Sequence, residues 1–407
     1  MSTTRLTLAG RVTLFSLFFA WGIVAVLVRM TVPHFRETFD LGYRDALLIQ
    51  SAFFITYLLF ARISGSVVAR IGLRSAVVLG ITLMAVGSLW LAVATLLQTF
   101  AALLPAVFVM ATGITFLQVA ANPLAAIEGG LKTTQGNLTF AQGFNSLGTV
   151  AAPLLAAAAF LGTAAEPLTP VRWLFGAICL ALILLAFLAR SLLAHGPQHV
   201  PVDSPPASVS RLAPFERNRL IAGVAALFLY VGAEVSISTT LVNLLEADGM
   251  IAATRTSSAL LTSVFWLGML VGRFASVPLL DRLDRRVVLG FSGVACAILC
   301  IVAAFAGGTI AAVAILASGL FAGLQFPTIF AIASADLEPA SRARAAGWLC
   351  TGIVGGGIVP LVYGGVADRV SIEMALVVPF ACFLVIALFA WRFGKEQVSN
   401  LPASQAG

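Results

Sequence analysis

The chain has 407 residues, of which 60% are hydrophobic and only 10% are charged, whereas soluble domains carry about 25% charged residues. The one or two cores of a soluble protein of this length cannot hide so much apolar surface, so lipid must surround it. This composition excludes a disordered chain, a collagen-like fibre, a secreted disulfide scaffold and an ordinary soluble enzyme.

The cysteines and the net charge of +7 indicate neither a redox site nor a nucleic-acid partner. The basic residues stand singly between apolar runs, which is typical of a membrane-topology signal. The cysteines also lie in apolar runs, outside any CxxC or Cys/His pattern, and we interpret them as small core residues. We therefore expect no metal site and no cofactor. The five cysteines are Cys179, Cys296, Cys300, Cys350 and Cys382.

Twelve apolar stretches are close to the length of about 20 residues with which an α-helix crosses a bilayer. One connection between them, residues 195–217, is long, polar and proline-rich, which is typical of a linker. We therefore expect a six-helix half at 1–194 and another at 218–407. The stretches are 11–33, 45–69, 75–97, 100–127, 137–162, 171–193, 218–244, 256–280, 286–307, 309–333, 344–367 and 373–393.

The basic residues are unevenly divided between the two sets of connections. When both termini and every even-to-odd connection are placed on one side, that side holds sixteen of the 24 lysines and arginines and the other side holds five. Cytoplasmic loops are the ones enriched in basic residues. We therefore expect a multi-pass protein of the cell (inner) membrane with both termini in the cytoplasm. Three arginines remain within spans: Arg29, Arg62 and Arg273.

The segment after the second span is echoed after the eighth. Residues 65–74 (Gly-Ser-Val-Val-Ala-Arg-Ile-Gly-Leu-Arg) and residues 281–286 (Asp-Arg-Leu-Asp-Arg-Arg), which follow Gly272-Arg273, both resemble a basic loop of the major facilitator superfamily. That loop joins the second and third helices of each half, and the six-plus-six pattern fits the same superfamily. The resemblance implies cytoplasmic gating residues at Arg70, Arg74, Asp281, Arg282, Arg285 and Arg286.

Two charged residues deep within spans are candidates for function, because a charge inside a membrane is costly and usually faces a cavity or a partner. Glu234 is the one acid well inside a span, and Arg29 lies about two turns from the outer end of the first. The alternatives are that Arg29 snorkels to the interface and that Glu234 has a purely structural hydrogen-bonding role.

Amide side chains occur at helical spacing in the fourth and fifth spans. Gln118 and Asn122 share one helix face, as do Gln142 and Asn145. Carboxamides both donate and accept hydrogen bonds, which suits the hydroxyls of a sugar. The alternative is hydrogen bonding between helices. Pro123, directly after Asn122, predicts local unwinding of the fourth span.

Aromatic residues and a glycine cluster inside the spans favour packing roles. Aromatic side chains within a bundle are more often core than binding platform. Gly355-Gly356-Gly357, followed by Pro360, lies in an apolar helix without the preceding strand of a nucleotide loop, and predicts close helix packing and a hinge. The aromatic residues are Trp21, Tyr57, Tyr230, Trp266 and Trp348.

Six segments along the whole chain resemble the fucose–galactose–glucose:proton symporter family, one of them Gly355-Gly-Gly-Ile-Val-Pro360 running to Ala367-Asp368. Residues 117–124 (Leu-Gln-Val-Ala-Ala-Asn-Pro-Leu) and 141–148 (Ala-Gln-Gly-Phe-Asn-Ser-Leu-Gly) carry its most specific motifs. Residues 48–53, 230–234 and 325–330 agree as well. The family's first helix usually carries an acid tied to proton coupling, and its position here is Arg29. A second coupling acid precedes Ala-Ala-Asn-Pro in some members, and Gln118 occupies that position.

We therefore predict an all-α membrane protein with twelve transmembrane helices in two six-helix bundles and a solute cavity near the bilayer midplane. As a monomer, it imports a small polar solute, a sugar or sugar derivative, by alternating access; proton coupling stays open. Arg29 and Glu234 are the coupling candidates. The substrate-binding candidates are Trp21, Arg29, Gln50, Tyr57, Gln118, Asn122, Gln142, Asn145, Glu234, Asn243, Trp266 and Gln325.

Other functions compete with this one. An exporter of amphipathic compounds suits the apolar lining but not the paired amides. A membrane enzyme or lipid flippase is a further alternative, and the sequence has no cluster of catalytic residues. A transporter of an anionic solute, such as a sugar acid, would use Arg29, which keeps its charge and cannot carry a proton as an acid does. Either Glu234 or such a solute would then balance the charge of Arg29.

Overall fold

The computed structural model describes residues 6–40, 48–128, 130, 133–160, 168–193, 212–247, 249–251, 255–280, 282–335, 337 and 339–394. Within these ranges the chain is helical, without a β-strand. Asp281 and all but the last six residues of the predicted linker at 195–217 lie outside them.

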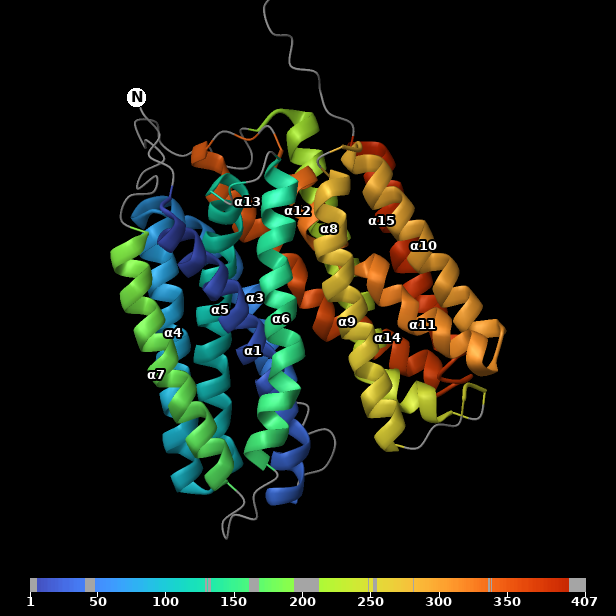
Figure 1. Cartoon of the computed structure of the whole chain (residues 1–407), viewed down its shortest axis with the longest axis horizontal. Coiled ribbons are helices and arrows are strands. Elements are labelled where there is room, and N and C mark those ends of the chain that lie inside the picture. Colours follow the sequence, from blue (N-terminus) through green and yellow to red (C-terminus); the bar gives the residue numbers. More distant parts are fainter. Residues whose placement is uncertain are drawn as a thin grey trace, which may run out of the picture.

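The first half of the chain forms one bundle of long helices, coloured blue to green in Figure 1. Each of the first six predicted spans corresponds to one of these helices. They are α1 (Leu8–Thr38), α3 (Leu48–Ile71), α4 (Leu73–Ala94), α5 (Phe100–Glu128), α6 (Thr134–Phe160) and α7 (Thr169–Leu192).

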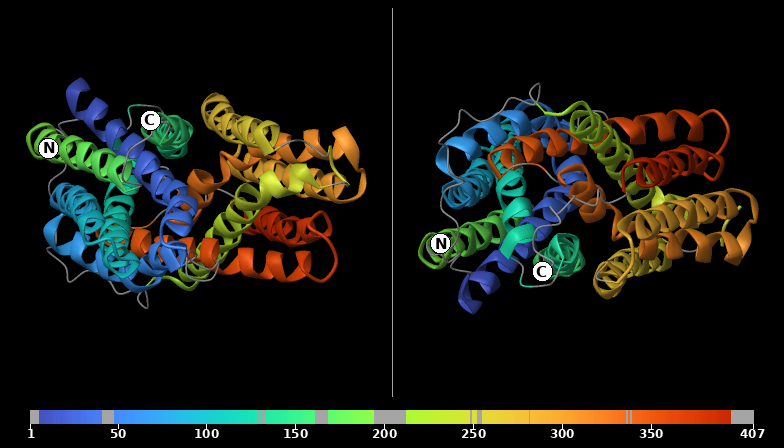
Figure 2. Two further views of the ribbon diagram at one scale, coloured as in Figure 1. Left: turned by 90° about the horizontal axis from the view of Figure 1, so that it is seen from below. Right: turned by 90° about the horizontal axis from the view of Figure 1, so that it is seen from above.

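The second half forms a second bundle, coloured yellow to red, and Figure 2 shows the two side by side from both ends. Two of its predicted spans are interrupted. One divides at Gly323–Leu324 and the other at a 3-10 turn, Gly352–Val354. The helices are α8 (Pro214–Glu246), α9 (Arg255–Leu280), α10 (Arg285–Phe305), α11 (Gly308–Ala322), α12 (Gln325–Ala333), α13 (Pro339–Thr351), α14 (Gly355–Ala367) and α15 (Val377–Phe393).

The helices have the length and composition of membrane spans. Eleven stretches of the described residues are long and apolar enough to cross a bilayer. α6 is not among them, although its 27 residues give it the length. It carries several polar side chains, including Gln142 and Asn145. The predicted all-α membrane fold is confirmed.

The predicted unwinding beside Asn122 is wrong. α5 continues without a break from Phe100 to Glu128 with Pro123 inside it. Asn122 is completely buried, so tightly packed neighbouring helices surround the proline. A membrane helix tolerates a proline where its surroundings satisfy the freed backbone groups.

The repeated basic loops fasten helix ends within each bundle. Arg74, at the start of α4, donates a hydrogen bond to the carbonyl oxygen of Arg190 near the end of α7. Arg285, at the start of α10, donates through Nε to the carbonyl oxygen of Gly394, 3.4 Å away, after the end of α15. A cation at a helix C-terminus stabilises the helix dipole. Equivalent helices of the two halves are thus capped in the same way.

The other predicted gating residues take different positions. Arg70 and Arg282 are exposed. Arg286 forms an ion pair with Asp284, with Nε 2.9 Å from Oδ2, and Asp284 caps the N-terminus of α10. Their part in gating remains a prediction.

The most extensive contacts between the bundles are made by two helix pairs, α6 with α9 and α3 with α13. In one, Phe274 of α9 packs edge-on against Phe140 and Phe144 of α6, with ring centroids 5.6 and 6.2 Å apart. In the other, Gly347 of α13 lies so close to α3 that a Cβ there would approach the carbonyl oxygen of Ala61 within 2.5 Å. All four helices meet near the ends that carry the basic loops, so the bundles are closed on that side.

Candidate functional site

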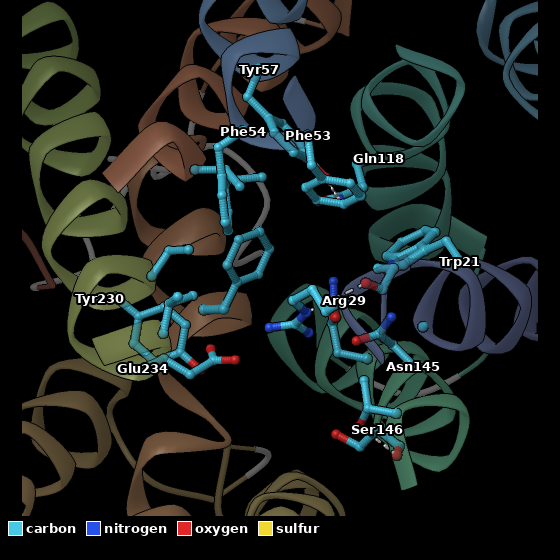
Figure 3. A pocket seen from close by; sticks show the side chains of 18 of the residues that line it. Trp21, Arg29, Phe53, Phe54, Tyr57, Gln118, Asn145, Ser146, Tyr230 and Glu234 are labelled. Atoms are coloured by element: carbon cyan, nitrogen blue, oxygen red, sulfur yellow. Dashed lines mark hydrogen bonds between the residues drawn. The ribbon is translucent and has the colours of Figure 1, made fainter. Parts of the chain in front are cut away.

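A cavity of about 130 Å³ lies between the two bundles. A buried water needs roughly 10–15 Å³ of such volume, so the cavity holds about ten waters or one solute with the dozen heavy atoms of a hexose. Figure 3 shows Trp21, Arg29 and Asn145 on one side and Tyr230 and Glu234 on the other. The described lining residues are Trp21, Gly22, Ala25, Arg29, Phe53, Phe54, Tyr57, Gln118, Gln142, Asn145, Ser146, Thr149, Tyr230, Val231, Glu234, Val235, Trp266, Arg273, Phe326 and Ile353.

Most of the predicted substrate-binding residues line this cavity. The first bundle contributes six of them and the second contributes Glu234 and Trp266. One aromatic indole thus comes from each bundle, which offers flat apolar faces on both sides of a bound ring. The six are Trp21, Arg29, Tyr57, Gln118, Gln142 and Asn145.

Four predicted residues do not line the cavity. Asn122 is completely buried one turn along α5 from Gln118, and its Oδ1 accepts a hydrogen bond from Gln142 Nε2 at 3.0 Å. Gln325 is also completely buried and faces α10, with Nε2 3.4 Å from Cys296 Sγ. Asn243 is exposed, and the half-buried Gln50 lies outside the lining.

The amides of the lining use their N–H groups within the protein. Gln118 Nε2 donates to Tyr57 Oη at 2.7 Å, and Asn145 Nδ2 donates to the carbonyl oxygen of Phe18 at 3.3 Å. Gln142 donates to Asn122, as described above. These bonds fix the side chains and leave the oxygens of Gln118 and Gln142 as acceptors for a solute hydroxyl. The predicted hydrogen bonding between helices is therefore present, and the role of these amides in binding a solute remains a prediction.

Arg29 and Glu234 face the same cavity from different bundles. Arg29 is on α1 and donates through Nε to the carbonyl oxygen of Ala25, 3.4 Å away. Glu234 is on α8. Their charges interact across the cavity, but in the described part of the chain no ion pair joins them. The alternative in which Glu234 balances Arg29 through direct contact is therefore not the arrangement in this structure.

Arg273 is the main feature of the site that the sequence did not reveal. It is only 5% exposed, and its Nη1 reaches from α9 to α6. There it donates to the carbonyl oxygen of Gln142 at 3.0 Å, to Ser146 Oγ at 2.7 Å and to Asn145 Oδ1 at 3.4 Å. Its Nε donates to the carbonyl oxygen of Gly323 at 2.8 Å. The sequence offered one signal for its role, which is the position of a charged residue within a membrane span.

Tyr230 also belongs to the lining. Its buried hydroxyl faces the side chains of Glu234 and Arg273, without a hydrogen bond of good geometry to either in the described part of the chain. The third arginine within a span, Arg62, lies outside the cavity and over the ring of Trp348, with Cζ 4.9 Å from the centroid. Arg62 is on α3 and Trp348 on α13, so this contact also joins the bundles.

Comparison with known proteins identifies the family. The Major Facilitator Superfamily profile matches residues 224–407. The chain is 35% identical to a glucose/galactose transporter of Brucella abortus, over 92% of this chain and 91% of the relative. It belongs to the major facilitator superfamily. Within that superfamily it falls in the branch of the glucose/galactose transporters and the L-fucose-proton symporters, one of which, from Escherichia coli, is 29% identical over 95% of this chain and 93% of its own length.

The structure agrees with this membership. The major facilitator transporter FucP in its outward conformation superimposes with a TM-score of 0.82 and 27% identity, over 95% of this chain and 99% of that one. A chain of this branch is a transporter and not an enzyme. The predicted fold and family are thus confirmed, while the roles of the individual lining residues remain predictions.

Proposed function

We propose that this major facilitator protein imports a sugar or a sugar derivative through the cell (inner) membrane by alternating access. The observation that carries the proposal is the cavity between the bundles, which holds one hexose-sized solute and is lined by amides and by an indole from each bundle. Amide oxygens suit sugar hydroxyls. Relatives named as sugar transporters support the same substrate class.

The conformation fits the first step of import. The bundles are held together near the basic loops, which the charge distribution assigns to the cytoplasm. The cavity is therefore closed on the cytoplasmic side and loads from outside. The cavity and both bundles belong to one chain, so a monomer suffices for transport.

Glu234 is our candidate for proton coupling. It is the one acid among the described residues of the lining. An acid in a membrane cavity can take up and release a proton, whereas an arginine keeps its charge. Arg29 and Gln118 occupy the positions where related symporters carry acids, so coupling in this chain would have to use a different residue.

Uptake into proteoliposomes tests the proposal. We expect accumulation of at least one labelled sugar from a panel of hexoses and their acids, and faster uptake when the outside is more acidic than the lumen. A panel in which no sugar is bound or taken up by well-folded protein would contradict the proposed function.

Truncation of the lining amides should weaken binding without unfolding the protein. We expect Gln118→Ala or Gln142→Ala to raise the Kd for a transported sugar by about 2- to 12-fold, since one hydrogen bond contributes roughly 0.5–1.5 kcal/mol. Isothermal titration in detergent measures the Kd. Asn243→Ala removes an exposed amide outside the cavity and is the matched control. Unchanged affinity in both lining variants, at normal expression, would leave those amides with a structural role alone.

The orientation is a second prediction. We expect a single cysteine introduced at Ser204, in the segment between the bundles, to react with an impermeant maleimide only after the membrane is opened. The reason is the excess of basic residues on that side. Labelling in intact cells would indicate the opposite orientation, and the cavity would then load from the cytoplasmic side.

A further inference from the structure

The guanidinium of Arg29 has unused hydrogen-bonding capacity in the cavity. An arginine carries five N–H donors, and the structure shows one long bond, from Nε to the carbonyl oxygen of Ala25 at 3.4 Å. Arg29 has no ion-pair partner in the described part of the chain. This arginine therefore differs from Arg273, whose Nε and Nη1 bind protein oxygens at four positions.

The charges of the lining do not balance. Among the described lining residues, two arginines, Arg29 and Arg273, are positively charged, and one acid, Glu234, can carry a negative charge. With Glu234 ionised, one positive charge remains uncompensated, and with Glu234 protonated two remain. An uncompensated charge in a site of low dielectric is unfavourable, and a bound solute of opposite charge relieves it. Arg29 is the arginine that a solute can pair with, because the Nε and Nη1 donors of Arg273 already bind protein oxygens.

A neutral sugar satisfies only part of this site. Its hydroxyls can accept hydrogen bonds from Arg29, but the positive charge persists after water has been displaced. A single carboxylate balances the charge and also matches the planar fork of the guanidinium with two parallel hydrogen bonds. With Glu234 ionised, a dianion would exceed the balance and bring a second negative charge toward Glu234, which costs free energy.

We propose that the preferred solute is a monocarboxylate sugar, such as a hexuronate or an aldonate, whose carboxylate pairs with Arg29. The remaining hydroxyls of this solute bind the amide oxygens of Gln118 and Gln142. The cavity volume of about 130 Å³ matches the size of one such solute. This inference rests on the proposed function and specifies its substrate class.

The test compares two solutes that differ in one group. D-galacturonate carries a carboxylate where D-galactose carries a hydroxymethyl group. For the wild-type protein in detergent at neutral pH, we expect isothermal titration to show at least about tenfold tighter binding of the acid. In Arg29→Gln, affinity for D-galacturonate should fall by about 30-fold or more, as when one partner of a buried charge pair is removed, while affinity for D-galactose falls far less. Arg29→Lys keeps the charge but loses the fork, so the preference for the acid should be intermediate.

The possible results separate this inference from the proposed function. Wild-type binding of D-galactose as tight as that of D-galacturonate, or equal losses for both in Arg29→Gln, would refute the role of Arg29 in charge recognition and leave sugar transport intact. Absence of binding for every sugar and sugar acid of the panel would refute both. The comparison in the wild-type protein needs no substitution, so a folding defect of a variant does not affect it.

Discussion

Replacement of Arg273 by alanine is expected to open the protein on the side of the basic loops and to lower uptake by at least about tenfold. Arg273 makes three hydrogen bonds from α9 to α6 across the interface between the bundles. A hydrogen bond to a charged group contributes about 1.5–3 kcal/mol. The loss of even one such bond shifts the equilibrium between the conformation closed on this side and the conformation open on this side by about tenfold or more.

Spin labels on the two bundles measure this opening. Ser66, near the end of α3, and Val287, near the start of α10, are both exposed and lie at the closed ends of different bundles. We expect the distance distribution between labels at these positions to move to longer values in Arg273→Ala. An unchanged distribution, with uptake preserved, would show that the contacts of Arg273 do not hold the bundles together.

Two further arginines provide a graded comparison. The contact of Arg62 with Trp348 also joins the bundles, but an exposed cation–π contact contributes only about 0.5–1 kcal/mol. The shift of the distance distribution in Arg62→Ala should therefore be smaller than the shift in Arg273→Ala. Arg217 is exposed near the start of α8, and Arg217→Ala is expected to leave the distance distribution unchanged.

The fold was predictable because the bilayer permits few structures. A chain segment in lipid must satisfy its own backbone hydrogen bonds, so each long apolar stretch had to be a helix. The division of one span at Gly352–Val354 could be anticipated from the adjacent glycines. The continuity of α5 through Pro123 could not, because it depends on packing around Asn122 from other helices.

Helical periodicity predicted which side chains of the site share a helix face, but not which of them line the cavity. Gln118 and Asn122 share a helix face, as their spacing predicts, yet one lines the cavity and the other lies beneath it against Gln142. Periodicity fixes a face of a helix and not its depth or its partner. The bridge from Arg273 to α6 joins residues more than 120 positions apart, and a single sequence does not specify which helices of the two bundles meet.

Replacement of Gly355 by alanine is expected to cause a large loss of stability. Gly355 begins α14 and lies against α8, where an added methyl group would overlap the carbonyl oxygen of Phe228. Backbone cannot rotate away as a side chain can, so the two helices must separate. Overpacking of this kind typically costs about 1–3 kcal/mol, and sometimes more. A lower apparent Tm in detergent, together with less monodisperse protein after heating, measures the effect.

Gly364 is the matched control because it lies in the same helix with nothing within 4 Å of an added Cβ. Alanine is favoured over glycine inside a helix by about 0.5–1 kcal/mol, so Gly364→Ala should be neutral or slightly stabilising. The two variants have the same chemical change and the same change in helix propensity, and they differ in what the methyl group contacts. Opposite shifts of Tm would therefore assign the loss in Gly355→Ala to the contact between α14 and α8. Equal shifts would show that α14 and α8 can move apart at little cost, and that a glycine at position 355 is not needed for close packing.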